Sequence, residues 1–333
     1  MLEPASVPDQ QTRHSGSFPV AWIANDCKTN LDQAVQWVIK NVEELTQSAS
    51  ENGAVLFRGL PIHTAEDFDR FVTAFGYDNF EYRKSLSNAV RTNFTDRIFS
   101  ANEAPAEVTI YLHHEMAQTP LFPSKLFFFC QKAAESGGAT PLCRSDWLFE
   151  AMQERLPEFA AACETKGLKY TTVMPGTDDA KSGMGRSWPS TFRAESKADA
   201  ERKMSDLNYS WEWLDDGCLK ATTAVLPAVH QLSCGRKVFF NQLIAAFKGW
   251  KDGRNDPAKA ITLGDGTPLH RDTVLQVADL AETLTYDMNW QTTDVVLIDN
   301  YVAMHGRRTF TGTRKVLASL ADAESHDECH GFI

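Results

Sequence analysis

Residues 108–116, VTIYLHHEM, place two adjacent histidines and a glutamate inside an otherwise apolar run. The β-branched and aromatic residues of this run favour a strand over a helix. Successive side chains of a strand point to opposite faces, so His113 and Glu115 would share one face and His114 would take the other. In a helix His113 and Glu115 would diverge by about 200°, too far apart to bind one ion.

A histidine and a carboxylate two positions apart on one strand face form two-thirds of a 2-His-1-carboxylate facial triad. Such a triad binds Fe(II) and leaves coordination positions open for oxygen and a co-substrate. The third ligand has to be a distant histidine that the fold brings close. His-x-Glu triplets are common, and the alternative interpretation is an exposed pair on an ordinary strand.

A second segment strengthens the metal interpretation. Residues 292–320, TTDVVLIDNYVAMHGRRTFTGTRKVLASL, contain an apolar strand candidate, then His305, and then Arg314 before another apolar run. A guanidinium pairs with a carboxylate through two parallel hydrogen bonds and does not lose its proton. A histidine followed nine positions later by an arginine therefore indicates a metal ligand beside an anion site.

The rest of the chain indicates a mainly β fold with helical insertions. Short segments rich in β-branched or aromatic residues, mostly separated by Gly, Pro or Asp, are predicted as strands at 53–62, 108–114, 125–133, 168–174, 218–229, 237–241, 294–300 and 314–321. Helical patterns are predicted at 31–49, 64–76, 145–163 and 270–288. Because strands and helices do not alternate regularly, we expect a sandwich or barrel flanked by helices.

We expect one domain over residues 1–333, with a loose polar arm at 1–18 and a flexible tail at 325–333. The tail contains His326, Cys329 and His330, which could instead supply metal ligands.

Composition bounds the partners and the compartment. The 333 residues are 43% hydrophobic and 23% charged, and the net charge of −11 argues against a nucleic-acid groove. The seven cysteines are irregularly spaced without a CxxC pair, so neither a disulfide framework nor a zinc ribbon is indicated. The N-terminal residues contain no apolar leader, and no apolar run reaches membrane length. We therefore expect a reduced, cytoplasmic protein with no membrane or nucleic-acid partner.

Several motifs, taken together and in order, resemble one family. They are GAVLFRGLPI, LHHEMAQTPLFPSKLFFFCQKAAESGGATPL, GRSWPSTF, WLDDGCL, KVFFNQ and DNYVAMHGRRTFTGTRKVL. The first begins at about residue 53, and the last ends at residue 317. They are similar to the taurine-dioxygenase-like Fe(II)/2-oxoglutarate-dependent oxygenases, and most of all to the branch that acts on amino acids and related natural products.

This resemblance implies a double-stranded β-helix, or jelly roll, flanked by helices. It implies that His113, Glu115 and His305 bind Fe(II), and that Arg314 and Thr140 bind the far carboxylate of 2-oxoglutarate. Gly137 and Gly138 would let the backbone turn beside Thr140.

The implied activity is O₂-dependent oxidation of an unactivated C–H in a small amino-acid-like metabolite, free or tethered to a carrier. This oxidation would be coupled to the conversion of 2-oxoglutarate into succinate and CO₂. Hydroxylation is the default outcome, and desaturation, epoxidation or oxidative cyclisation would use the same iron. A silent jelly-roll binding protein and a zinc hydrolase with the same ligands are the alternatives.

Five further residues have a functional and a structural interpretation. Asn241 could line the pocket or cap a turn, and Asp299 could orient His305 or belong to an ordinary turn. Arg307 could meet a substrate carboxylate or lie on the surface, as could its neighbour Arg308. Arg186 lies in a Gly/Ser/Pro-rich segment that could be a lid or a plain connection.

Overall fold

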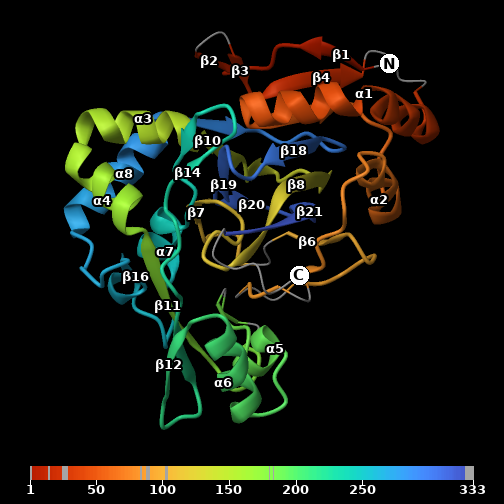
Figure 1. Cartoon of the computed structure of the whole chain (residues 1–333). Helices are drawn as coiled ribbons and strands as arrows, with labels where there is room; N and C mark the ends of the chain where they lie inside the picture. Colours follow the sequence, from red (N-terminus) through yellow and green to blue (C-terminus); the bar gives the residue numbers. More distant parts are fainter. Residues whose placement is uncertain are drawn as a thin grey trace.

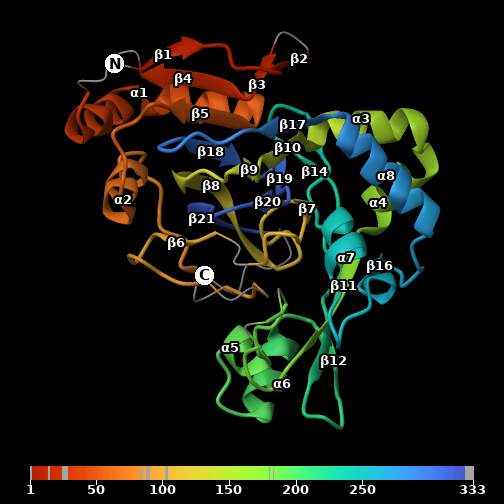
Figure 2. The ribbon, with the colours of Figure 1, turned by 180° about the vertical axis from the view of Figure 1, so that it is seen from behind.

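The computed structural model describes residues 2–13, 16–24, 29–82, 85–87, 91–101, 104–179, 181–182 and 184–326. Two β-sheets lie face to face, and helices cover their outer sides (Figure 1). A smaller group of strands and helices projects from one end, as the view from behind also shows (Figure 2).

The larger sheet has seven strands. In order across the sheet they are β1 (Leu2–Ala5), β4 (Val20–Ala24), β5 (Ala54–Arg58), β18 (Val295–Asp299), β8 (Leu121–Lys132), β21 (Lys315–Ser325) and β6 (Phe99–Ser100). All neighbours are antiparallel except β4 and β5. Alternate residues of β18 serve two cores, because Val296 and Ile298 face the smaller sheet while Val295 and Leu297 face the outer helices.

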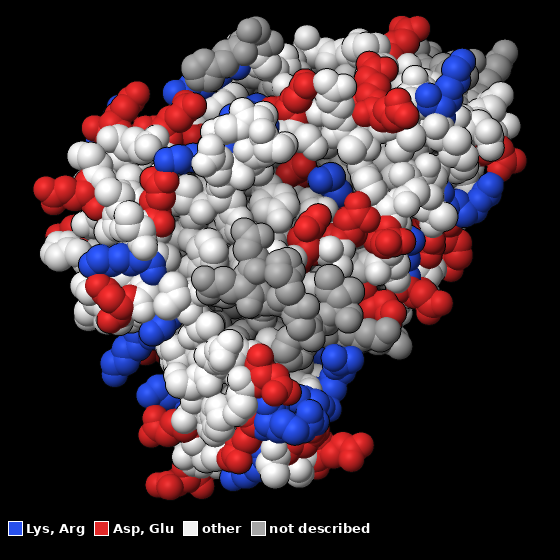
Figure 3. Space-filling view, viewed as in Figure 1, with Lys and Arg blue, Asp and Glu red and all other residues white. Residues whose placement is uncertain are grey.

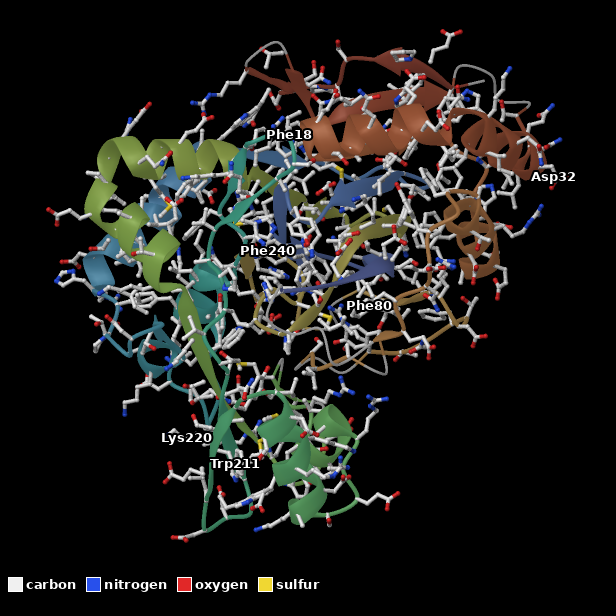
Figure 4. The ribbon with its side chains drawn as sticks, viewed as in Figure 1. Phe18, Asp32, Phe80, Trp211, Lys220 and Phe240 are labelled. Carbon is white, nitrogen blue, oxygen red and sulfur yellow. The ribbon has the colours of Figure 1, made fainter. Side chains whose placement is uncertain are left out.

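The smaller sheet has four antiparallel strands. They are β17 (Thr285–Met288), β10 (Thr140–Arg144), β19 (Ala303–Arg307) and β7 (Ile110–His113). Leu142 and Ala303 of this sheet pack against Leu56 and Leu126 of the larger one, and Phe240 belongs to the same buried core (Figure 4). The predicted double-stranded β-helix is confirmed.

Two helices cover the outer face of the larger sheet: α1 (Leu31–Asn52) and α2 (Ala65–Thr73). Both begin with a reciprocal side-chain cap, from Asn30 for α1 and from Thr64 for α2.

Four helices cover the outer face of the smaller sheet. They are α3 (Ser145–Arg155), α4 (Pro157–Lys166), α7 (Leu243–Gly249) and α8 (Arg271–Thr283). The predicted helical segment 145–163 is two helices, because Pro157 lacks an N–H and begins a new one after the non-helical Leu156. The end of the predicted helical segment 270–288 is instead strand β17.

The projecting part has its own small core, which includes Met174, Phe192, Met204 and Leu219. Its elements are β11 (Leu168–Met174), β12 (Ser210–Trp213), β13 (Leu219–Thr222), α5 (Trp188–Phe192) and α6 (Lys197–Asp206). Strand β16 (Ile261–Leu263) pairs with the start of β11 but packs into the core under the outer helices of the smaller sheet. Trp211 and Lys220 mark its two-stranded tip in Figure 4.

Short pairs of strands complete the fold. They are β2 (Gln11–Arg13) with β3 (Gly16–Phe18), β9 (Ser136–Gly137) with β20 (Phe310–Thr311), and β14 (His230–Gln231) with β15 (Lys237–Val238). A 3-10 turn spans Pro257–Lys259.

The prediction of a loose arm at 1–18 is wrong. Strand β1 pairs with β4 along its whole length, and Phe18 is fully buried beneath α1, edge to face with Trp147 (Figure 4). Backbone pairing and one anchoring aromatic ring therefore order a segment whose composition is polar. The predicted tail is ordered at its start, since β21 reaches Ser325 and His326 is buried, whereas 327–333, with Cys329 and His330, lie outside the described residues.

Acidic and basic side chains are interspersed on the face shown in Figure 3. Among the described residues, no helix combines the length and the apolar character needed to cross a membrane.

Candidate metal centre

Strands β7 and β19 bring two histidines together. His113 and His305 are direct partners in this antiparallel pair, and their ring centroids lie 4.4 Å apart. Leu112 and Met304, one position earlier in each strand, face the outer helices. Strand alternation therefore directs both imidazoles into the space between the two sheets.

Glu115 reaches the same place by a turn. Strand β7 ends at His113, so Glu115 does not lie on the strand as its spacing predicts. Its Oε2 atom nevertheless lies 3.8 Å from His113 Nε2 and 3.6 Å from His305 Nε2. One ligand atom from each of the three residues lies within 4.8 Å of the others.

Asn300 fixes the turn that carries Glu115. Its Oδ1 accepts the Glu115 N–H at 2.8 Å, and its Nδ2 donates to the Glu115 carbonyl at 2.9 Å and to the Pro123 carbonyl at 2.7 Å. The neighbouring His114 is fully buried against Phe240 and its Nδ1 bonds the Asn300 carbonyl, so this histidine has a structural role.

The surroundings shift two of the three side chains, His305 and Glu115, towards the unprotonated forms that a divalent metal needs. Burial lowers the pKa of His305 to about 4. Burial alone would raise the pKa of Glu115, but the two imidazoles and the charge of Arg91 outweigh it and hold this pKa well below its usual value. The Nδ1 of His113 lies 2.7 Å from the Tyr111 carbonyl and donates to it, which orients the ring so that Nε2 is directed towards Glu115. Two imidazoles and one carboxylate suit Fe(II).

We expect Asn300→Ala to weaken both the fold and the metal site. The change leaves the N–H and C=O of Glu115 without their partner, so unfolding free energy should fall by about 2–4 kcal/mol and Fe(II) affinity by roughly 10–100-fold. Urea denaturation and anaerobic Fe(II) titration measure the two effects.

Asn241→Ala is the matched control, since Asn241 is another buried asparagine whose side chain bonds a different turn. It should lower stability and leave Fe(II) affinity unchanged. Unaltered Fe(II) affinity in Asn300→Ala would show that Asn300 does not position Glu115.

A small cavity of about 50 Å³ lies behind the three residues, and Thr140 and Arg314 line it with them. We call it the inner cavity. Arg314 donates from Nε to the Gly138 carbonyl at 3.0 Å and approaches Thr140 Oγ1 at 3.5 Å. Trp290 Nε1 also donates to Thr140 Oγ1, at 3.0 Å. Because this oxygen accepts from two N–H groups, the Thr140 hydroxyl can donate its own proton to a ligand.

Arg314 is a largely enclosed cation without an acidic partner among the described residues. Burial, together with the nearby charge of Arg307, lowers its pKa to about 10, so it remains charged at neutral pH. An enclosed charge without a counter-ion is costly. A bound anion would therefore find a preformed partner here.

Two glycines create the room for Arg314. Gly137 and Gly138 have φ of 67° and 70°, which a side chain rarely allows. A Cβ on Gly137 would lie 2.4 Å from the Thr309 carbonyl oxygen, and one on Gly138 would lie 3.0 Å from Arg314 Cδ.

A wider cavity of about 590 Å³ adjoins the inner one, and we call it the outer cavity. The two share Arg91, Ile110, His113 and Glu115 as lining residues. The candidate metal ligands therefore lie at the junction between a small recess with an anion partner and a larger space that could take a substrate.

A larger hollow of about 1,120 Å³ lies elsewhere, between the N-terminal strands and α3. Its buried Arg144 is held by Asp146, which also pairs with Arg236. None of the three candidate ligands lines it.

The structure favours the structural interpretation for Asn241 and Asp299. Asn241 Oδ1 accepts the N–H of Leu243 at 2.9 Å, which is the turn cap. The Asp299 carboxylate bonds Lys125 at 3.0 Å and Ser50 at 3.1 Å, so it does not orient His305. Asp299, at the end of β18, therefore joins the larger sheet to α1.

Arg307 and Arg308 also have structural partners. Arg307 lines the inner cavity, but its guanidinium donates to the carbonyls of Ala104, Pro105 and Val108. Arg308 lies at the surface, paired with Glu282 and Asp287.

Arg186 ties two segments together and lines neither the inner nor the outer cavity. It donates to the Ser85 and Ser87 carbonyls and to Ser190.

The sequence analysis did not predict a role for Asn300 or Trp290. Asn300 follows Asp299 at the end of a strand, and this position was a signal that could have identified it.

Comparison with known proteins agrees with this geometry. The Taurine catabolism dioxygenase TauD, TfdA family matches residues 18–320. The clavaminate synthase-like protein of Arabidopsis thaliana is 45% identical over 271 residues, which cover 81% of this chain and 82% of that protein. The dapdiamide synthesis protein DdaC of Enterobacter agglomerans is 27% identical over 290 residues, with 82% and 83% covered.

Solved structures share the fold. AAD-2, in complex with Mn(II) and N-oxalylglycine, superposes with a TM-score of 0.53 at 14% identity and covers 98% of this chain and 99% of that one. PvcB, an Fe, alpha-ketoglutarate dependent oxygenase, gives 0.53 at 13% identity, with 92% and 88% covered. The chain is thus an Fe(II)/2-oxoglutarate-dependent dioxygenase and belongs to the TauD, TfdA family.

Proposed function

We propose that His113, Glu115 and His305 bind Fe(II), and that Arg314 and Thr140 bind the carboxylate of 2-oxoglutarate remote from the metal. One observation carries this proposal. The same small cavity holds three converging metal-ligand side chains and an enclosed arginine that has no acidic partner among the described residues. Iron with 2-oxoglutarate and O₂ would supply the oxidising power, and succinate and CO₂ would be released.

The substrate in this proposal is a small amino-acid-like metabolite that enters the outer cavity, free or tethered to a carrier. An unactivated C–H would be oxidised, by hydroxylation or by cyclisation or desaturation. Support for a natural-product substrate comes from relatives, since DdaC is named for dapdiamide synthesis and PvcB comes from an isonitrile synthetic pathway.

The chain's own residues position and shield the reaction. Arg314 would fix one end of the co-substrate, and the Thr140 hydroxyl would donate to the same carboxylate. The ring of Phe128 lies 5.1 Å from that of His305 and closes one side of the inner cavity. A recess of about 50 Å³ leaves little space for water once the co-substrate is bound.

A zinc hydrolase or a silent binding protein would explain less of this site. Zinc could accept two histidines and a glutamate. A zinc hydrolase gives no reason for the Arg314 and Thr140 recess, and a silent binding protein has no need of the three ligands together with both recess residues.

The first experiment needs no substrate. We expect anaerobic addition of Fe(II) and 2-oxoglutarate to give the weak visible charge-transfer band of the chelate, and Arg314→Ala to weaken it. Arg308→Ala, which removes a surface arginine, is the control and should keep the full band. Bound metal without a band in the wild type would reject the proposal and favour the alternatives.

A further inference from the structure

Gln118 is a buried polar residue in the wall of the outer cavity. It follows the metal-ligand turn, three positions after Glu115, so its Cα lies within about 11 Å of the Glu115 Cα. Its side chain is only 7% exposed, and no group in the described part of the chain lies within hydrogen-bonding distance of its Oε1. A buried amide oxygen without a partner costs free energy, so its retention calls for a ligand.

A second unpartnered group faces the same place. Gln118 also lines a recess of about 30 Å³ between the metal-ligand turn and the projecting part of the fold. Thr191 of α5 lines this recess too, is 3% exposed, and its Oγ1 is likewise without a hydrogen bond to any described residue. Tyr170 and Thr223 add further polar side chains to its wall.

The charges of the outer cavity oppose those of the whole protein. Outside the metal ligands, its lining contains four basic residues, Arg91, Lys181, Lys251 and Arg254, and two acidic ones, Asp179 and Asp252. The chain as a whole has a net charge of −11. A locally positive cavity in an acidic protein favours an anionic substrate.

Arg91 brings this positive charge close to the metal ligands. It lines both cavities, as Glu115 does, and lines the inner one together with His305. A substrate carboxylate would therefore be attracted toward the junction of the two cavities.

We propose that Gln118 is a substrate-positioning residue, whose Oε1 accepts a hydrogen bond from the amino group of an amino-acid substrate, with Thr191 behind it. The carboxylate of that substrate lies in the positive field of Arg91. This inference rests on the proposed function and adds the group that orients the substrate over the iron. Acylation leaves a single uncharged N–H and adds bulk beside it, so the charge-assisted bond from an ammonium group to Oε1 is lost.

The test compares free and N-acetylated amino acids as probes. The twenty proteinogenic L-amino acids and their N-acetyl derivatives are supplied with Fe(II), 2-oxoglutarate and O₂, and succinate release is measured against probe concentration. In the wild type, we expect at least one free amino acid to stimulate release, and N-acetylation to raise its KM at least about tenfold.

In Gln118→Leu, the KM for the free amino acid should rise roughly 10–100-fold, and N-acetylation should then have little further effect. Gln118→Met keeps the length of the side chain without its oxygen and guards against a packing defect. Thr191→Val should shift KM in the same direction by a smaller factor. In all three variants the charge-transfer band formed without substrate should be unchanged.

Gln131→Leu is the matched control. Gln131 is a glutamine of β8 whose Oε1 also has no partner among the described residues, but it lines neither cavity. Its replacement should alter neither KM nor the band.

Three results would overturn the inference while leaving the proposed function intact. One is an unchanged KM in the Gln118 variants, as expected if a buried water simply bridges Gln118 and Thr191. Another is undiminished discrimination against N-acetyl probes in those variants. The third is a normal band with no amino acid stimulating succinate release. Absence of the band in the wild type would instead reject the proposed function itself.

Discussion

Glu115→Ala is expected to abolish Fe(II) binding and succinate release. Glu115 supplies the only negative charge among the three candidate ligands, and its Oε2 lies within 4 Å of the Nε2 atoms of both histidines. Loss of a partner outside the coordination shell already costs roughly 10–100-fold in metal affinity, so loss of a ligand should cost more. Anaerobic Fe(II) titration and the charge-transfer band measure the effect directly.

Glu115→Gln separates charge from shape. It keeps the side-chain volume beside the histidines but removes the carboxylate, and it should lose iron nearly as completely as the alanine variant. Glu282→Ala, at the surface, is the control and should bind iron normally. Full activity in Glu115→Ala would refute the metal assignment.

Arg314→Ala is expected to raise the KM for 2-oxoglutarate by roughly 30–1,000-fold. A bidentate, charge-assisted pair with a carboxylate contributes about 2–4 kcal/mol, and the Arg307 guanidinium in the same cavity is already bonded to backbone carbonyls. Steady-state succinate release against 2-oxoglutarate concentration checks this value. Iron affinity without co-substrate should change little, since Arg314 is not a candidate ligand.

Arg314→Lys refines the same prediction. A lysine keeps the charge but forms no fork, so the KM should lie between those of the wild type and the alanine variant. Arg308→Ala should leave the KM unchanged. If Arg314→Ala altered the affinity for the organic substrate alone, the arginine would belong to the substrate site instead.

Local pattern predicted the elements that carry the histidines, but not the contact that places the glutamate. Alternation along β7 and β19 directs His113 and His305 inward, as the sequence indicates. Glu115 converges with them through Asn300, which is 185 residues away in the chain. A single sequence carries no record of such a long-range bond, so the sequence predicts the convergence of Glu115 with the histidines from a strand geometry that the structure does not have.

The N-terminal arm and the polar residues at strand ends show the same limit. The polar residues 1–18 carry no periodic pattern, and the described ones are ordered by the edge of β4, by the pairing of β2 with β3 and by the pocket for Phe18. Asp299 and Asn241 match either interpretation equally well in sequence. A tertiary partner fixes the structural role of Asp299, which bonds Lys125, and the Leu243 N–H fixes that of Asn241.

The position of β21 determines when the protein can become active during its synthesis. This strand is the last one described in the chain, yet it lies inside the larger sheet and pairs with β8 from Lys132 to Leu121. A ribosome that has released only the first 300 residues has produced neither His305 nor Arg314, and it leaves β8 with an open edge that invites aggregation. The nascent chain at that length therefore cannot assemble the proposed iron site, and the strand that closes the open edge of β8 is translated only after it.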